Sequence, residues 1–492
     1  MPEASSKDYV AVLDIGSNAV RFVVYDGLNR APFKIHNERT QCHLGKHLAT
    51  TGMLNPDGVN AAFEAIGRYA GLIKAMKIKQ VKAVATAAMR DAKDGGDFIK
   101  KVKSEFGLKI DIIEGEEEAR LASQGVMMNG LGANGVIGDY GGGSLELIVV
   151  EKDVVKHKTS LPIGAHRLHA IQGEAAQKKA VEEQLAGVPF LQNYEGRDFY
   201  AMGGAWRSMA RAHMRMIKHP VLMLDHYTID GKKAADYAAY IAKQSPASLA
   251  KTVGMMEKRV HDIGVAAMAM ACVFDILKPS RLIFSGTGLR EGLLYDQLAP
   301  AVQKEDSLLA SCEKIARQVS RFSDHDGFEA LYKWIAPLYG AADAQTKKLL
   351  KASCLLSDIG WFEHEDYQAD HAFERILVMP FYGTDHAGRA HLALTQYVRY
   401  GGDPDRKSET VQKLLTEKDV TVATVTGLAL ATGYLLTGGA LGLLKDSELI
   451  LEGKTITLNL RAKSHMLNAE VVTKAFGRLA DAMGKDAVIK TA

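Results

Sequence analysis

The sequence has little cysteine, little net charge and no long stretch free of polar residues. Its 492 residues include four cysteines, which lie far apart and form no CxxC pair. That spacing argues against a zinc ribbon and a disulfide framework, and it is typical of a reducing cytoplasm. Because the net charge is only +3, a polyanionic partner would have to be met by a local basic patch.

Segments for targeting or membrane insertion are also missing. We find no uninterrupted apolar run long enough to span a bilayer, and residues 1–10 lack the basic and apolar regions of a signal peptide. We therefore expect a cytoplasmic protein that binds neither membranes nor nucleic acid. The length exceeds what one hydrophobic core serves, so we expect about three or four domains.

Strand and helix patterns alternate along the first 305 residues, which predicts an α/β fold. Asn55 and Pro56 predict a helix start, as N-cap and first helical residue. The acidic start of the segment 114–127 predicts another helix, because carboxylates suit the positive end of the helix dipole. Apolar runs predict strands at 9–13, 20–26, 81–86, 109–113, 198–202 and 281–285.

Beyond residue 306 the pattern is mostly helical. The segment 347–367 predicts a long helix that ends near Gly360, and 447–454 and 455–460 predict a pair of strands. We place four domains on the chain, the first two with matching strand patterns, the third helical and the last a small α+β domain. Their boundaries are 1–130, 131–305, 306–407 and 408–492.

Two segments of the α/β region repeat each other. Residues Asp14–Val24 align without gaps on Asp139–Val149. In both, an apolar strand ends in Asp-X-Gly, turns through small residues and returns as a second apolar strand. A long-range repeat of this kind predicts two related subdomains that face each other.

The two repeated turns predict a phosphate site. Successive backbone N–H groups in such turns bind anions, and glycine lets the backbone approach closely. Arg21 adds a guanidinium that can hold a phosphate through two hydrogen bonds. Asp14 and Asp139, at the strand ends, are candidates for holding a divalent cation through water. The turn residues are Gly16, Ser17 and Asn18 in the first copy and Gly141, Gly142, Gly143 and Ser144 in the second. Taken singly, either turn also suits an ordinary tight hairpin.

Two further glycine turns follow strands and precede helices, so they place helix N-termini at the same edge of the sheet. They are Gly203-Gly204, followed by Arg207, and Gly286-Thr287-Gly288, followed by Arg290. Each alone is weak evidence, because glycine often ends a strand in α/β folds. Together with the repeated turns they extend the candidate phosphate site.

Seven motifs in order resemble the exopolyphosphatase / guanosine pentaphosphate phosphohydrolase (Ppx/GppA) family. They span residues 12–297 and read DIGSNAVRFVVYD, ATAAMRDA, EGEEEARL, IGDYGGGSLEL, LPIGAHRL, AMGGAWRSMA and SGTGLREGLLYD. The resemblance implies a duplicated actin/hexokinase/Hsp70-like fold with ribonuclease H-like domains. It also implies release of orthophosphate from the end of inorganic polyphosphate, with hydrolysis of pppGpp to ppGpp as a related activity.

The resemblance also implies roles for single residues. In the family's GxEEA motif the catalytic carboxylate precedes the alanine, which is Glu118 here, and Arg90 matches a phosphate-binding arginine. Asp139 and Glu146 match positions linked to the metal. Mg²⁺ is the implied ion, with Mn²⁺ and K⁺ as further ions, and a homodimer is the implied assembly. From the residues alone, the run Glu116–Glu118 equally suits a solvated acidic helix start.

The C-terminal half carries weaker signals. Helices with His325-Asp326 and LLSDIGW resemble an HD-phosphohydrolase-like domain, but Ser357-Asp358 stands where a His-Asp doublet is needed. We therefore expect an inert helical domain without a metal there, and we interpret HEDYQADH (364–371) as a polar loop. Candidates to line a path for a long polyanion are Arg389, Arg399, Arg406, His386 and His391.

Exopolyphosphatase activity is thus the first hypothesis, and three alternatives remain open. A pppGpp 5′-phosphohydrolase would use the same site and would need a way to recognise guanine. A sugar or acetate kinase of the same superfamily would need an adenosine pocket and an acceptor site. A non-enzymatic polyphosphate or nucleotide sensor would bind but not cleave.

Overall fold

The computed structural model describes residues 8–252, 260–322, 325–461 and 469–491. The chain divides into two compact units. Unit 1 comprises 1–218 and 224–305, and unit 2 comprises 219–223 and 306–492. Unit 1 contains two large sheets, and unit 2 is mostly helical with one small sheet.

The first sheet of unit 1 has five strands in the order β3-β2-β1-β4-β5. The first three strands pair antiparallel, and β4 and β5 add in parallel to β1. The strands are β1 (Val10–Ile15), β2 (Ala19–Tyr25), β3 (Lys34–Gln41), β4 (Gln80–Ala85) and β5 (Asp111–Ile112). The strand β3 was not predicted, because all of its side chains except Ile35 are polar and none of them is buried.

The second sheet repeats this order with one extra strand at its edge. Its order is β10-β11-β9-β6-β7-β8, in which β6 and β7 correspond to β1 and β2. The pair β6–β7 and the pair β7–β8 are antiparallel, and β9 and β11 add in parallel. The strands are β6 (Gly135–Tyr140), β7 (Leu145–Glu151), β8 (Val154–Leu161), β9 (Asp198–Met202), β10 (Tyr227–Asp230) and β11 (Arg281–Phe284).

The register of the two hairpins confirms the predicted repeat. In the first copy Asp14 stands opposite Arg21, and in the second Asp139 stands opposite Glu146. These are the positions that the gapless alignment equates. The two copies therefore share strand order, turn position and register, although few of their residues are identical.

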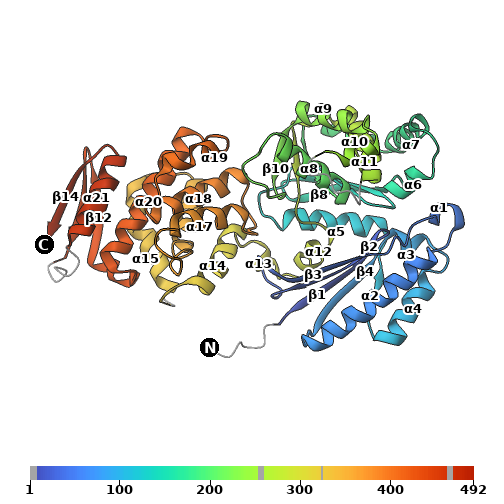
Figure 1. Ribbon diagram of the computed structural model, residues 1–492, viewed down its shortest axis with the longest axis horizontal. Coiled ribbons are helices and arrows are strands. Elements are labelled where there is room, and N and C mark those ends of the chain that lie inside the picture. Colours follow the sequence, from blue (N-terminus) through green and yellow to red (C-terminus); the bar gives the residue numbers. More distant parts are fainter. Residues whose placement is uncertain (1–7, 253–259, 323–324, 462–468, 492) are drawn as a thin grey trace. The chain divides into compact units, whose positions relative to one another are not determined.

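Two helices lie between the sheets, α5 (Gly115–Met127) and α12 (Leu289–Tyr295) (Figure 1). Leu121 of α5 and Leu294 of α12 pack on β1 and β2, while Ala119 and Ala122 of α5 pack on the second sheet. The two helices approach so closely that a methyl group at Gly292 would overlap the carbonyl oxygen of Leu121. Both sheets thus rest on one tightly packed pair of helices.

The outer faces of the sheets are covered by longer helices. The first sheet packs on α2 (Pro56–Ala75) and α4 (Gly95–Phe106), and the second on α8 (Gly204–Met216), α9 (Gly231–Ala242) and α11 (Val260–Leu277). Pro56 occupies the first turn of α2 as predicted. The Asn55 side chain, however, caps no helical N–H, because its amide donates to the carbonyl of His43 at 3.2 Å.

Unit 2 packs its helices around α18 and α20, beside a small sheet (Figure 1). Its main helices are α14 (Ser307–Val319), α15 (His325–Ile335), α16 (Ala344–Leu355), α17 (Gln368–Val378), α18 (His386–Arg399), α20 (Glu417–Thr437) and α21 (Glu470–Ala482). The predicted strand pair is present as β12 (Ser447–Glu452) and β13 (Thr455–Leu460), and an unpredicted strand β14 (Asp486–Thr491) pairs parallel to β13.

One expectation for the helices needs correction. The helix predicted to end near Gly360 is α16, which ends at Leu355. Turns replace the helix from Leu356 onward. We also found no uninterrupted apolar run that could span a bilayer. By length and overall composition, however, α11 and α20 would each be able to cross a membrane. In both, 67% of the apolar window is buried inside the protein, which is how core helices pack.

Candidate active site

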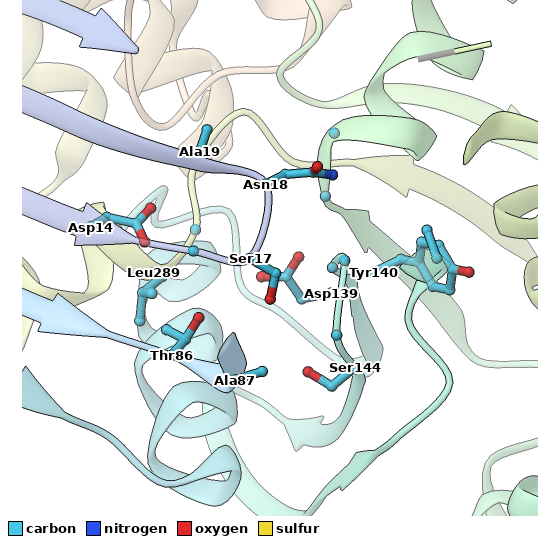
Figure 2. A pocket seen from close by; sticks show the side chains of 18 of the residues that line it. Asp14, Ser17, Asn18, Ala19, Thr86, Ala87, Asp139, Tyr140, Ser144 and Leu289 are labelled. Carbon is cyan, nitrogen blue, oxygen red and sulfur yellow. The ribbon is translucent and has the colours of Figure 1, made fainter. Parts of the chain in front are cut away.

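A pocket opens between the two sheets of unit 1, where the repeated turns meet. Its volume is about 190 Å³. Figure 2 shows Ser17 on the turn that follows Asp14 and Ser144 on the turn that follows Asp139, both at the same pocket. Of the predicted site residues, the lining contains Asp14, Gly16, Ser17, Asn18, Arg21, Glu118, Asp139, Gly141, Gly142, Gly143, Ser144, Gly203, Gly204, Arg207 and Arg290.

The two turns have the same backbone construction. The N–H of Gly16 donates to the carbonyl of Ala19 at 3.1 Å, and that of Gly141 to the carbonyl of Ser144 at 2.9 Å. The carbonyl groups of each turn accept hydrogen bonds from the backbone of a neighbouring segment. The donors are the N–H groups of residues 42, 43 and 45 in the first copy and of residues 164–166 in the second. Within the described part of the chain, the backbone N–H groups of residues 17 and 18 and of residues 142 and 143 donate no hydrogen bond.

These N–H groups are donors in a concave backbone, the arrangement that binds anions. Close packing is a second reason why glycine stands in the turn at 141–143. A methyl group at Gly143 would stand 2.8 Å from the Cβ of Ala87 and 3.3 Å from the Ser17 hydroxyl. Glycine therefore also lets the turn of the second copy approach the first copy, a close contact that the sequence did not reveal.

Four arginines surround the pocket: Arg21, Arg39, Arg207 and Arg290. Burial, the charge of Arg290 and other nearby arginines lower the pKa of Arg21 to about 9 against the opposing effect of Asp14. Burial likewise lowers the pKa of Arg207, and again Arg290 contributes. Cations crowded enough to lower one another's pKa are stabilised by a bound anion.

Two of these arginines are held in place by hydrogen bonds within unit 1, Arg207 by the turn that precedes α12 and Arg290 by β1. Arg207 donates to the carbonyls of Ser285 and Thr287 at 3.0 and 2.8 Å. Arg290 donates to the carboxylate of Asp14 at 3.0 Å. The N-terminus of α12 is itself fixed, because Glu291 accepts from the N–H of Gly288 at 3.0 Å. The cations are therefore oriented before any ligand binds.

The three adjacent glutamates at the start of α5 have different surroundings. Glu116 is 72% exposed and stands 3.6 Å from Lys158, and Glu117 pairs with Arg120 at 2.7 Å. Glu118 alone of the three lines the pocket. The acidic start of the helix is thus a solvated ion-pair surface at two positions and a pocket residue at the third.

Glu118 has an incompletely bonded carboxylate. Its Oε2 is buried without a hydrogen bond, and Nη1 of Arg90 lies 3.7 Å away. Burial raises the pKa of Glu118 well above its usual range, and the neighbouring Glu146 and Asp139 carboxylates add to the effect. A carboxylate with a raised pKa and a free oxygen at a pocket wall suits proton transfer from water.

Glu146 and Asp139 form an acidic group, in which Asp139 lines the pocket and Glu146 is buried behind it. Glu146 is 1% exposed and accepts from the hydroxyl of Ser160 at 2.8 Å. Burial, together with Asp139, raises the pKa of Glu146 to about 7. Burial also raises the pKa of Asp139, against the opposing charge of Arg207.

This acidic group can be tested for its fit to Mg²⁺. Among the described residues, no three histidine, cysteine or acidic side chains converge as a ready metal cage. Mg²⁺, however, is typically held by one or two carboxylates together with substrate phosphates and water. Asp139 at the wall and the mutual repulsion of the buried carboxylates fit an ion of that kind.

Three predicted site residues lie outside the lining. Arg90 stands behind Glu118 and donates to the carbonyl of Ile113 at 3.1 Å, and Glu146 is covered by its sheet. The N–H of Gly286 donates to Asp225 at 2.6 Å, so Gly288 takes its place at the pocket. The charged lining residues missed were Arg39, on the unpredicted strand β3 opposite Arg21, and Asp262 of α11.

In unit 2, the proposed path for a polyanion is wrong at three of its residues. Arg389 is fully buried and donates to the carbonyls of Met379 and Phe381. His386 and His391 are 6% and 4% exposed, so neither offers a surface to a long chain.

At the position of the expected broken metal site, Ser357 and Asp358 are both buried, and Asp358 pairs with Arg321.

Comparisons with known proteins agree with the motifs. The family model described as the Ppx/GppA phosphatase family matches residues 23–301, and one described as the C-terminal part of exopolyphosphatase matches 309–489. Retrograde regulation protein 2 of Saccharomyces cerevisiae is 22% identical over 84% of this chain and 76% of its own. A guanosine-5′-triphosphate,3′-diphosphate pyrophosphatase of Vibrio cholerae is 24% identical over 73% and 74%.

Two solved structures are similar in fold. A Ppx/GppA family member from Aquifex aeolicus gives a TM-score of 0.51 at 25% identity, covering 59% of this chain and 97% of its own. An exopolyphosphatase from Cytophaga hutchinsonii gives 0.54 at 20% identity, covering 58% and 96%. The predicted duplicated actin-like fold, followed by a helical region and a small C-terminal α+β part, is confirmed.

Proposed function

Since the chain belongs to the Ppx/GppA phosphatase family, we propose that it is an exopolyphosphatase, which hydrolyses the terminal phosphoanhydride of inorganic polyphosphate. The observation that carries the proposal is the composition of the pocket. Four arginines and two backbone turns with unused N–H groups surround it, and one carboxylate with an unbonded oxygen stands at its wall. This combination suits a polyanion with one reacting end.

Each group has a role in the proposed reaction. The N–H groups of the turns and the arginines bind the phosphate oxygens and offset their charge. Glu118 accepts a proton from a water molecule, whose oxygen forms a bond to the terminal phosphorus. The bond from that phosphorus to the bridging oxygen breaks, and the shortened chain leaves with the oxygen. Arg90, 3.7 Å from Glu118, keeps the carboxylate directed at the pocket.

We also propose that Asp139, with Asp14 and Glu146, holds Mg²⁺ in this pocket. The ion would supply charge neutralisation on the phosphate oxygens. The three carboxylates differ in access, because Asp14 and Asp139 line the pocket while Glu146 is buried behind it. Glu146 therefore contributes its negative charge from behind Asp139 and does not line the pocket.

Two observations support polyphosphate over pppGpp. The sole aromatic residue among the described lining residues is Tyr140, which is 2% exposed and stacks on Trp206 at 5.4 Å. It therefore offers no face on which guanine would stack. The match of residues 309–489 to the C-terminal part of exopolyphosphatase supports the same choice.

A direct comparison of substrates tests the proposal. Phosphate release is measured from long-chain polyphosphate and from pppGpp, each with and without Mg²⁺, and the Glu118→Gln protein serves as the control for contaminating phosphatases. We expect Mg²⁺-dependent release with a clear preference for polyphosphate. A strong preference for pppGpp would overturn the choice of substrate. Phosphorylation of a small acceptor by ATP without hydrolysis would favour a kinase, and binding without cleavage a sensor.

A further inference from the structure

Unit 2 contains a second cavity whose charged lining residues are all arginines. Its volume is about 440 Å³, and it lies among the end of α18 and the helices α20 and α21. The polar lining side chains are Arg321, Arg399, Arg478, Tyr400, Tyr434 and Gln368. Among the described lining residues there is no aspartate or glutamate. We call this cavity the arginine pocket.

Arg399, the last residue of α18, has no charged partner among the residues that the structure describes. Its guanidinium stands 3.9 Å from the centre of the Tyr434 ring and 4.5 Å from that of Tyr400. Its Nε is buried without a hydrogen bond, and no ion pair to it occurs among the described residues. Because a guanidinium keeps its charge and has five N–H donors, a half-buried one is stabilised by an acceptor that the protein does not supply.

Arg321 has an acidic partner, unlike Arg399 and Arg478 within the described part of the chain. It donates to Asp358 at 3.0 and 2.8 Å, and Asp358 is 3% exposed. Its guanidinium also lies 5.2 Å from the centre of the Tyr434 ring. One ring thus contacts two guanidinium groups, while one buried carboxylate offsets a single positive charge. With Arg478 included, the arginine pocket has a surplus of positive charge.

The same residues make a cation unsuited to this place. The hydroxyl of Ser357, where an HD-type site needs histidine, bonds the hydroxyl of Tyr434 at 2.8 Å. The carboxylate of Asp358 is already used by Arg321. A metal ion would therefore meet guanidinium groups in place of ligands, whereas an anion would meet unused donors.

We propose that the arginine pocket binds the phosphate group of a small anion, as a second ligand site apart from the hydrolytic pocket. Planar guanidinium groups bind phosphate through paired hydrogen bonds, and rings that hold them in position reduce the entropy lost on binding. Orthophosphate, a short polyphosphate and a nucleotide share this chemistry. The proposal does not rest on the substrate preference of the hydrolytic pocket.

Binding of three probes to the full-length Glu118→Gln protein tests the proposal, because this background prevents turnover. Orthophosphate, tripolyphosphate and GTP are titrated calorimetrically. We expect at least one probe to show a class of sites that Arg478→Gln or Arg399→Gln weakens by about 10- to 100-fold. Arg399→Lys, which keeps the charge but not the paired donors, should weaken it less. The probe affected identifies the source of the phosphate group.

Matched controls separate the two sites. Lys347→Gln removes one positive charge from an exposed position on α16 outside the arginine pocket and should change nothing. Arg290→Gln should weaken binding at the hydrolytic pocket and leave the other class intact. Because Arg478 is exposed, Arg478→Gln should leave the melting temperature unchanged even if Arg399→Gln lowers it. If neither arginine change alters the binding of any probe, the proposal is wrong, whether or not the protein hydrolyses polyphosphate.

Discussion

The two copies of the hairpin in unit 1 share a backbone but carry opposite charge at one matched position. In the first, Asp14 faces Arg21, and in the second, Asp139 faces Glu146. The first copy therefore holds a cation beside a carboxylate, and the second holds two carboxylates. One repeated scaffold thus presents a surface for an anion on one side and a surface for a cation on the other.

This difference has an energetic cost on the side of the second copy. Burial raises the pKa of both Asp139 and Glu146, which means that their charged forms are disfavoured where they lie. A buried pair of carboxylates with raised pKa values is typical of a functional site, where the negative charge binds a ligand or takes part in the reaction. The predictions below change one side of the comparison at a time.

The largest effect is expected at Glu118, which belongs to neither hairpin but lies between them. Glu118→Gln keeps the shape and removes the group that accepts a proton. We expect kcat for polyphosphate to fall by about 10²- to 10⁴-fold with little change in KM, measured by steady-state phosphate release. Glu117→Gln is the control, because Glu117 pairs with Arg120. A near-normal rate in Glu118→Gln would show that the base is misassigned.

Next come the two residues that distinguish the copies. Arg21→Gln should raise KM for polyphosphate by about tenfold or more, because a cation that binds the anion is lost. Glu146→Gln should instead raise the Mg²⁺ concentration needed for half-maximal activity by about tenfold. Both are obtained from initial rates at varied polyphosphate and Mg²⁺. If the two variants change the same parameter, the division between an anion side and a cation side is wrong.

A smaller effect is expected in the pH dependence. Glu146 is, after burial, the largest contributor to the raised pKa of Glu118. Glu146→Gln should therefore lower that pKa and move the acidic limb of the kcat profile to lower pH, measured at saturating Mg²⁺. Glu117→Gln should leave the limb in place. An unchanged limb in Glu146→Gln would mean that the two carboxylates are not coupled.

The smallest effect concerns stability. The pKa of Glu146 is about 7 in the folded protein, above the value of about 4.3 in an unfolded chain. Its contribution to stability is thus full below pH 4 and is lost as the pH rises through 7. Glu146→Gln should raise the melting temperature by about 1–3 °C at pH 8 and by less at pH 4. Equal shifts at both pH values would point to packing instead of charge.

The sequence was most informative where a pattern was repeated. The alignment of Asp14–Val24 on Asp139–Val149 predicted that both segments are strand–turn–strand repeats, and the equal turn lengths explain why the two hairpins share one register. The strand β3 lacks an apolar face, so neither the strand nor its Arg39 was predicted. The contact of Gly143 with Ala87 joins residues far apart in the chain, and only the folded structure reveals such contacts.

In unit 2, the prediction of a broken metal site needed only two adjacent residues, Ser357 and Asp358. The arginine pocket at this position is formed by Arg321, Arg399 and Tyr434, which come from three separate segments. Their proximity has no local signal in the sequence. The same holds for Arg389, whose burial could not be inferred from its charge.

The close packing of α5 and α12 has a consequence for motion. Glu118 lies on α5 and Arg290 on α12, and the two helices are so close that even a methyl group at Gly292 would overlap the carbonyl oxygen of Leu121. If the two sheets open and close around a ligand, they would rotate about the helix pair α5–α12. The two repeated turns would then approach and separate, while the Glu118 carboxylate and the Arg290 guanidinium would keep their distance from each other.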